Sequence, residues 1–172
     1  MFDFHSLIHH RRSIRAYDST KRVSEEVLAR ILEAGRAAPS ATNRQPWKFI
    51  VVNDPAVKQK LNDCYNRPWF QDVPTVLVVV GYPDQAWVRA DGYNSLEMDL
   101  TIVMDHLILA AEYEGVSTCW MININPKAVA NAIGLEPGAV VHALTPLGYP
   151  PEGFVKPDGP NRKPLSEIVR MI

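Results

Sequence analysis

The longest helical pattern in the chain is SLEMDLTIVMDHLILAAEYE, which occupies residues 95–114. Its apolar residues recur at intervals of three and four and cover a wide arc of a helix; they are Leu96, Leu100, Val103, Met104, Leu107, Ile108 and Ala111. A helix that is apolar on most sides belongs in a protein core or in a subunit interface. We therefore expect this helix to lie at the centre of the fold.

Strand and helix patterns alternate on both sides of this segment. The β-branched run TVLVVV at 75–80 predicts a strand that is buried on both faces. Further strands are predicted at 47–52, 118–122 and 140–147. Further helices are predicted at 4–10 and 56–63, and another begins at Pro126. One more helix is predicted to begin after an N-cap at Ser24 and to end at Pro39. This alternation predicts an α+β or α/β sandwich with mixed strand order.

The end of the chain has a different character. The segment 150–164 contains Pro150, Pro151, Pro157, Pro160 and Pro164, and proline removes a backbone donor and stiffens an extended chain. We expect an extended arm from about residue 150. The rest of the 172 residues is of a size that forms one domain, so residues 1–172 are expected to be a single domain with a C-terminal arm.

Composition excludes several classes of function. The net charge is −1 and 47% of the residues are hydrophobic, which does not suggest a nucleic-acid or membrane partner. The beginning of the chain has no apolar signal core, and Cys64 and Cys119 are far apart, so we expect two reduced thiols in a cytoplasmic protein. The pairs His9-His10 and Asp105-His106 lack a spaced third ligand, so no metal site is expected.

Two basic clusters lie at opposite ends of the chain. The first contains Arg11, Arg12 and Arg15 around Ser13, and guanidinium groups match the oxygens of a phosphate. The second is Arg162-Lys163, which a stiff arm could carry back to the first. Taken singly, the first cluster is more typical of a solvated basic helix end and the second of a surface pair.

A third polar segment lies between two prolines, at 39–46. Its amide and hydroxyl side chains could bind the carbonyls and ring nitrogens of a heterocycle, or the segment could be an ordinary loop. Aromatic residues leave a similar choice, because Trp69, Phe70 and Trp87 could line a substrate pocket or belong to the core.

Taken in order, these motifs resemble the nitroreductase-like family of FMN-dependent oxidoreductases. The matching stretches are Arg11 to Tyr17, Ala38 to Trp47, Gly148-Tyr149-Pro150 and Arg162 to Leu165, and they extend over nearly the whole chain. The resemblance implies an α+β fold with a mixed sheet flanked by helices. It also implies that the long helix at 95–114 lies at the interface of a homodimer.

The resemblance assigns residues to an FMN site at the subunit interface. Arg11, Arg12, Ser13 and Arg15 are expected to hold the phosphate and ribityl chain, and Arg162 and Lys163 to close over the same phosphate. Ser40, Asn43 and Gln45 are expected to reach the flavin, with Pro39 and Ser40 coming from the other subunit.

One segment departs from the family pattern. The family often has glycine where this chain has Ile122 and Asn123, next to flavin N5 and O4. A main-chain N–H of either residue can still donate there, although the side chains crowd the flavin more than glycine would.

The activity that the resemblance implies is the transfer of electrons from NAD(P)H, by a ping-pong mechanism, to electron-poor acceptors such as nitroaromatics or quinones. No catalytic side chain is identified, because the cofactor supplies the reactive centre. Two alternatives remain: a specialised flavoenzyme of the same fold, such as a dehalogenase or an oxidase, and a non-catalytic protein that stores FMN.

Overall fold

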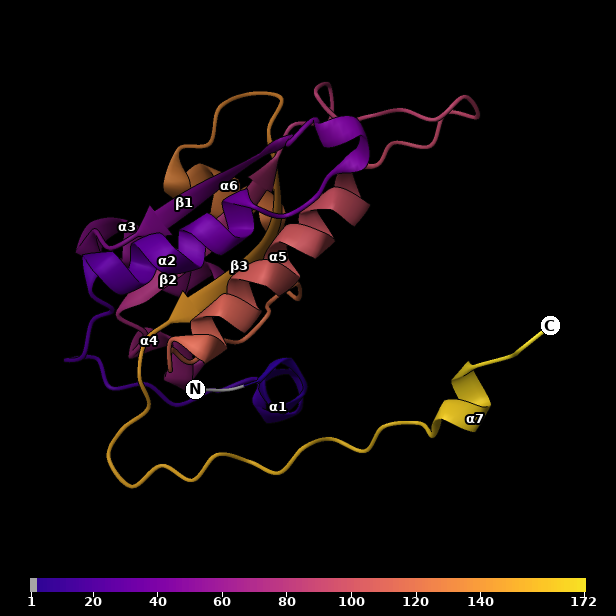
Figure 1. The fold of residues 1–172 in the computed structure, drawn as a ribbon. Coiled ribbons are helices and arrows are strands. Elements are labelled where there is room, and N and C mark those ends of the chain that lie inside the picture. The colour runs from indigo at the N-terminus through magenta and orange to yellow at the C-terminus, as the bar shows by residue number, and fades with distance from the viewer. Residues whose placement is uncertain (1–2) are drawn as a thin grey trace.

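The computed structural model describes residues 3–172, and it consists of a three-layered domain with a long C-terminal arm (Figure 1). The helices are α1 (Phe4–His10), α2 (Glu25–Arg36), α3 (Pro55–Cys64), α4 (Pro68–Gln71), α5 (Leu96–Tyr113), α6 (Pro126–Ile133) and α7 (Leu165–Ile168), with a 3₁₀ turn at Ala41–Asn43. The strands are β1 (Trp47–Val52), β2 (Thr75–Gly81) and β3 (Val140–Leu147). The long helix and these three strands confirm the sequence predictions. Among the described residues, no helix is both long and apolar enough to cross a bilayer.

The sheet has the order β1-β2-β3, and both pairings are antiparallel. The central strand β2 is buried along its whole length, as its β-branched run predicts. Val79 lies opposite Ala143, whereas the next residue, Val80, lies opposite Val141. His142 is therefore the extra residue of a β-bulge, which re-aims side chains locally.

The segment 118–122 does not form the regular strand that was predicted. It makes only single bridges, a parallel one between Ser13 and Thr118 and an antiparallel one between Met121 and Leu144. Between them the Thr145 hydroxyl accepts from the Cys119 N–H at 3.2 Å, so a side chain takes the place of a ladder carbonyl. The parallel bridge gives the β structure its mixed character.

Two cores lie on the two faces of the sheet. Helices α2 and α5 cover one face, where Leu77, Val79 and Ala143 are buried, while α3, α4 and α6 lie on the other with Val76 and Val78. In α2, a Cβ on Gly35 would lie 2.6 Å from Leu107 Cδ2 of α5. Glycine there allows the two helices to approach closely.

The caps of the helices follow local sequence rules. The Ser24 hydroxyl accepts from the Val27 N–H, which confirms it as the N-cap of α2. Helix α6 begins with Pro126 in its first turn, as predicted, and ends at Gly134 with φ of +64°.

The arm leaves the domain after β3. No helix or strand occurs between Leu147 and Leu165, and α7 then lies clear of the domain, far from the sheet (Figure 1). The side chains of Leu165 and Ile168 in α7 are 73% and 62% exposed, so the arm ends in an apolar turn that its own domain does not cover.

Candidate functional site

The arginine segment begins at the C-cap of α1 and runs beside residue 118. The Ile14 N–H donates to the Thr118 carbonyl at 2.8 Å, and the Ile14 side chain is buried. Because side chains alternate along extended chain, Ser13 and Arg15 share the opposite, partly exposed face. Both residues lie beside the Cys119 side chain, where their polar groups act to lower the pKa of its thiol.

The Cys119 thiol lies beneath this face and is buried. Burial raises its pKa, and the positive charges of Arg15 and Arg11 oppose that shift only in part. The thiol is therefore neutral and unreactive, and it lies beside the guanidinium groups of Arg11 and Arg15.

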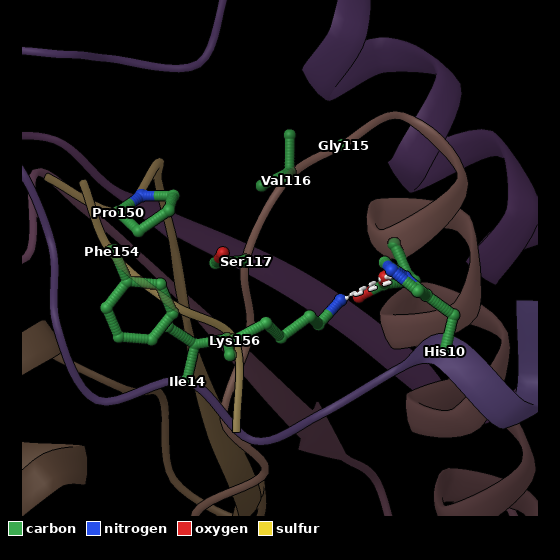
Figure 2. A pocket seen from close by; sticks show the side chains of 9 residues that line it. His10, Ile14, Gly115, Val116, Ser117, Pro150, Phe154 and Lys156 are labelled. Atoms are coloured by element: carbon green, nitrogen blue, oxygen red, sulfur yellow. Dashed lines mark hydrogen bonds and ion pairs between the residues drawn. The ribbon is translucent and has the colours of Figure 1, made fainter. Parts of the chain in front are cut away.

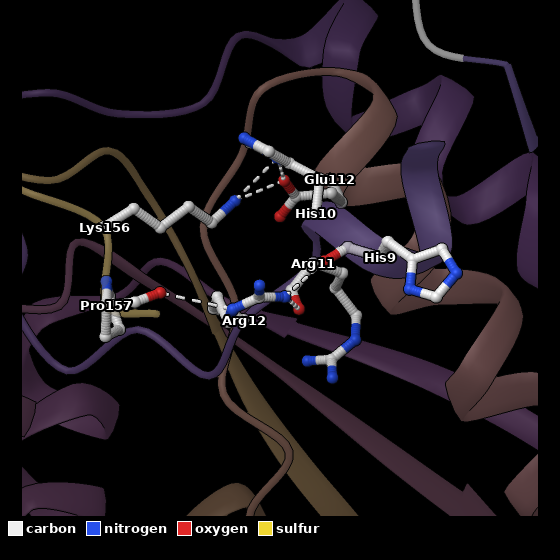
Figure 3. Close-up of polar contacts among 7 residues, drawn as sticks. All are labelled: His9, His10, Arg11, Arg12, Glu112, Lys156 and Pro157. Atoms are coloured by element: carbon white, nitrogen blue, oxygen red, sulfur yellow. Dashed lines mark hydrogen bonds and ion pairs between the residues drawn. The ribbon is translucent and has the colours of Figure 1, made fainter. Parts of the chain in front are cut away.

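Arg12 differs from its neighbours because its guanidinium is bonded to the main chain (Figure 3). Nη1 donates to the carbonyls of His9 at 2.6 Å and Arg11 at 2.8 Å, and Nε donates to the Pro157 carbonyl at 3.2 Å. Farther along the arm, a Cβ on Gly159 would lie 2.6 Å from Arg12 Nη2. Arg12 thus connects the arm to the arginine segment.

A buried carboxylate attaches the beginning of the arm at a second point (Figures 2 and 3). Glu112 of α5 is 5% exposed; its Oε1 lies 2.5 Å from His10 Nδ1 and also bonds to Lys156 Nζ. A buried charge needs such partners, so this ion cluster fixes Lys156 to the domain. It borders a pocket of about 360 Å³ that Phe154 also lines.

The predicted flavin-binding loop has a strained backbone. Thr42, Asn43 and Gln45 have φ of +51°, +57° and +52°, a region that residues with a Cβ adopt only at some cost in energy. The Ser40 hydroxyl accepts from the Gln45 N–H at 2.9 Å, and Gln45 Nε2 donates to the Asn43 carbonyl at 3.1 Å. These bonds within the loop hold its polar side chains in one arrangement.

Asp99 of α5 anchors this loop, although no motif in the sequence pointed to it. Its carboxylate is fully buried and accepts from the Ala41 N–H at 2.9 Å and from the Ser95 hydroxyl at 2.8 Å. The available signal was an acidic residue on the buried arc of an otherwise apolar helix.

The structure brings some of the predicted residues together. Residues 118–122 join the arginine segment, at the Ser13–Thr118 bridge, to Ile122, whose side chain is 70% exposed. Four residues of extended chain span about 13 Å. Within residues 3–172, the main-chain N–H groups of Ile122 and Asn123 donate to no main-chain carbonyl.

Other predicted residues stay apart in the single chain. Arg162 and Lys163 are exposed and lie just before α7, away from the domain (Figure 1). No hydrogen bond of the described residues joins the loop at 39–45 to the arginine segment.

Two of the three aromatic candidates, Trp69 and Phe70, belong to the core, whereas Trp87 is half-buried and lies in neither core cluster. Phe70 is fully buried, and its ring packs edge-on against Tyr65 and Trp69, so its suggested place in a substrate pocket is wrong. Trp69 packs against the same core, on the face of the sheet opposite α5. Its apolar surface is needed there for packing.

Comparison with known proteins identifies the family. The family model described as "Nitroreductase family" matches residues 8–67 and 62–149, and the chain belongs to this family. A curated relative, the NADH dehydrogenase of Thermus thermophilus, is 30% identical over 92% of this chain and 91% of its own length. Iodotyrosine deiodinase 1 of Rattus norvegicus is 26% identical over 97% of this chain and 68% of its own.

Solved structures show the same fold. A nitroreductase family protein from Clostridium difficile 630 has a TM-score of 0.88 and 31% identity, over 98% of both chains. A protein from Exiguobacterium sibiricum, described as a nitroreductase in complex with FMN, has a TM-score of 0.85 and 23% identity, over 100% of this chain and 98% of its own.

Proposed function

We propose that the chain binds FMN in a homodimer and transfers electrons from NAD(P)H to electron-poor acceptors such as nitroaromatics or quinones. Family membership, a relative named NADH dehydrogenase and a structural neighbour in complex with FMN support this function. The free thiols of Cys64 and Cys119 fit a cytoplasmic location.

The observation that carries the proposal is the strip from the arginine segment to Ile122. At one end, the guanidinium groups of Arg11 and Arg15 and the Ser13 hydroxyl are the donors that a phosphate requires. At the other end, the N–H groups of Ile122 and Asn123 are open to the acceptor atoms of a flavin edge. The donor set at both ends therefore fits FMN.

Each group of residues then has a distinct task. Bound FMN supplies the electron-transfer chemistry, and the protein positions it. Arg11, Ser13 and Arg15 hold the phosphate, and main-chain N–H groups at Ile122 and Asn123 stabilise negative charge on the ring edge. Arg12 acts as the clamp of the arm, because its Nε and Nη1 already bond to carbonyls.

The homodimer completes the site in this proposal. The segment just before α7, which contains Arg162 and Lys163, lies away from the domain of its own chain (Figure 1), so a second copy is the body that it can close upon. Pro39 and Ser40 likewise reach the flavin of the partner, with Ser40, Asn43 and Gln45 presented by the loop that Asp99 anchors.

A second candidate function is reductive dehalogenation. The similarity to iodotyrosine deiodinase 1 extends over 97% of this chain and favours it over the oxidase and FMN-storage alternatives. The exposed Ile122, in place of glycine, would shape the acceptor space in either reaction.

The test is FMN binding followed by anaerobic reduction. We expect a yellow protein that NADH or NADPH bleaches, and that a nitroaromatic, a quinone or a halophenol then reoxidises. Arg15→Ala removes charge-assisted bonds and should weaken FMN binding at least tenfold. Arg22→Ala is the matched control, because Arg22 is an exposed arginine outside the site. A protein that binds no FMN would refute the proposal, and a bound flavin that neither nucleotide bleaches would refute the reductase activity.

A further inference from the structure

A hollow of about 440 Å³ lies between α5, β3 and residues 120–122. We call it the His142 hollow, and its lining residues are Glu97, Thr101, Trp120, Ile122 and His142. It adjoins the Ile122 end of the proposed FMN strip, but the proposed cofactor contacts use none of the polar side chains in it.

The β-bulge places His142 in this hollow. Regular alternation would put residues 142 and 143 on opposite faces of the sheet, whereas the bulge lets His142 share the α5 face with Ala143. His142 Nδ1 consequently lies 3.0 Å from Glu97 Oε2, in the first turn of α5.

Two ring nitrogens at the hollow have no hydrogen-bond partner among the described residues. They are Trp120 Nε1 and His142 Nε2, and both atoms are shielded from water. The His142 side chain is only 7% exposed. A buried polar nitrogen without a partner is destabilising, so a ligand that bonds to both nitrogens would recover that energy.

The chemistry of these groups defines the ligand. Trp120 Nε1–H is a donor only, and His142 Nε2 either donates or accepts according to its protonation. The hollow therefore suits an oxygen atom that gains a proton during the reaction. The Glu97 carboxylate, which is 76% exposed, disfavours an anionic ligand.

We propose that the His142 hollow binds the carbonyl edge of an uncharged acceptor of the quinone class, with Trp120 and His142 bonded to its oxygen atoms. This inference rests on the proposed function and names the residues that select the acceptor. Ile122 supplies the apolar wall against the ring of the acceptor.

The reduction is balanced with His142 as the source of one proton. Bound, reduced FMN would supply the quinone with two electrons and one proton, as a hydride. The second proton passes from protonated His142 Nε2 to the carbonyl oxygen and gives the hydroquinone. The neutral imidazole then accepts from the new hydroxyl, and it regains a proton from water beside the exposed Glu97 carboxylate.

The binding test uses the oxidised protein without reductant, so that it does not depend on turnover. The probes are 1,4-naphthoquinone and its anionic 2-sulfonate, and the readout is the indole N–H resonance of Trp120 in ¹⁵N-labelled protein. We expect this resonance to move with the neutral quinone, and Trp120→Phe to weaken its binding about tenfold. Glu97→Gln should reduce the preference for the neutral probe several-fold. Trp69→Phe, on the other face of the sheet, is the control.

A kinetic test isolates His142. His142→Gln should slow reoxidation of the reduced protein by 1,4-naphthoquinone at least tenfold more than it slows bleaching by NAD(P)H. An unmoved Trp120 resonance, unchanged quinone binding in Trp120→Phe, or loss of FMN from that variant would overturn the inference. Failure of the proposed function is separate, since it shows as absent FMN binding or absent bleaching in the unaltered chain.

Discussion

Removal of the Asp99 carboxylate should both destabilise the protein and weaken its hold on FMN. Asp99→Ala leaves the Ala41 N–H and the Ser95 hydroxyl without their buried acceptor. Bonds to a charged acceptor contribute about 1.5–3 kcal/mol each, so we expect a loss of about 3 kcal/mol or more. For a chain of this size that is a fall in Tm of roughly 6–12 °C.

The isosteric variant separates charge from hydrogen bonding. In Asp99→Asn the amide oxygen can still accept from the Ala41 N–H, and the amide nitrogen can donate to the Ser95 hydroxyl. We expect a loss of only about 1 kcal/mol from the weaker, neutral bonds. Asp105→Ala, an exposed acidic residue on the same helix, should leave the Tm nearly unchanged.

The effect on FMN follows from the strained loop. Without its anchor the loop can relax from the left-handed conformations of Thr42, Asn43 and Gln45, and binding must then restore about 1–3 kcal/mol per residue. FMN titration of Asp99→Ala should show affinity weakened at least tenfold. A large fall in Tm with unchanged FMN affinity would show that Asp99 only stabilises the fold. Equal effects of the alanine and asparagine variants would refute the hydrogen-bond argument.

Three further predictions test other parts of the structure. Arg11→Ala should weaken FMN binding at least tenfold, whereas Arg12→Ala should change it by less than about threefold and instead speed proteolysis of the arm; equal FMN losses would contradict the clamp. Lys156→Met should cost about 2–3 kcal/mol and accelerate hydrogen exchange at 153–157, because Glu112 loses a partner; an unchanged Tm would count against the ion cluster. Burial lowers the pKa of Lys58 to about 8, so as the pH rises the folded protein loses this proton before the unfolded protein does. The free energy of unfolding should therefore rise between pH 8 and 10.5, by at most about 3 kcal/mol relative to Lys58→Met. Chemical denaturation of both proteins across that pH range measures this rise, and parallel pH profiles for the two proteins would refute the prediction.

Local patterns predicted the main elements because local physics determines them. The apolar arc at 95–114 became α5, and the β-branched run at 75–80 became the buried β2. The segment 118–122 has similar β propensity, yet it forms only single bridges. The reason is tertiary, because Thr145 supplies a side-chain acceptor to Cys119 that no local pattern reveals.

The sequence predicts which kinds of residue form the candidate site, but not the contacts that those residues make. The sequence indicates that Arg12 belongs to a phosphate-binding cluster, but the arm carbonyl that it binds is 145 residues away along the chain. Asp99 and His142 were missed for a similar reason. Each acts through a contact between distant segments, and the bulge that turns His142 toward α5 depends on the register of β2 against β3.

The apolar end of the arm is not covered by its own domain, so we expect the order of the C-terminus to depend on protein concentration. The side chains of Leu165, Ile168 and Met171 are 73%, 62% and 92% exposed, so the last turn gains little from its own domain. In the proposed homodimer a second copy would cover these residues, so their order should depend on protein concentration. On dilution, the domain should keep its fold while the C-terminal turn loses its order first.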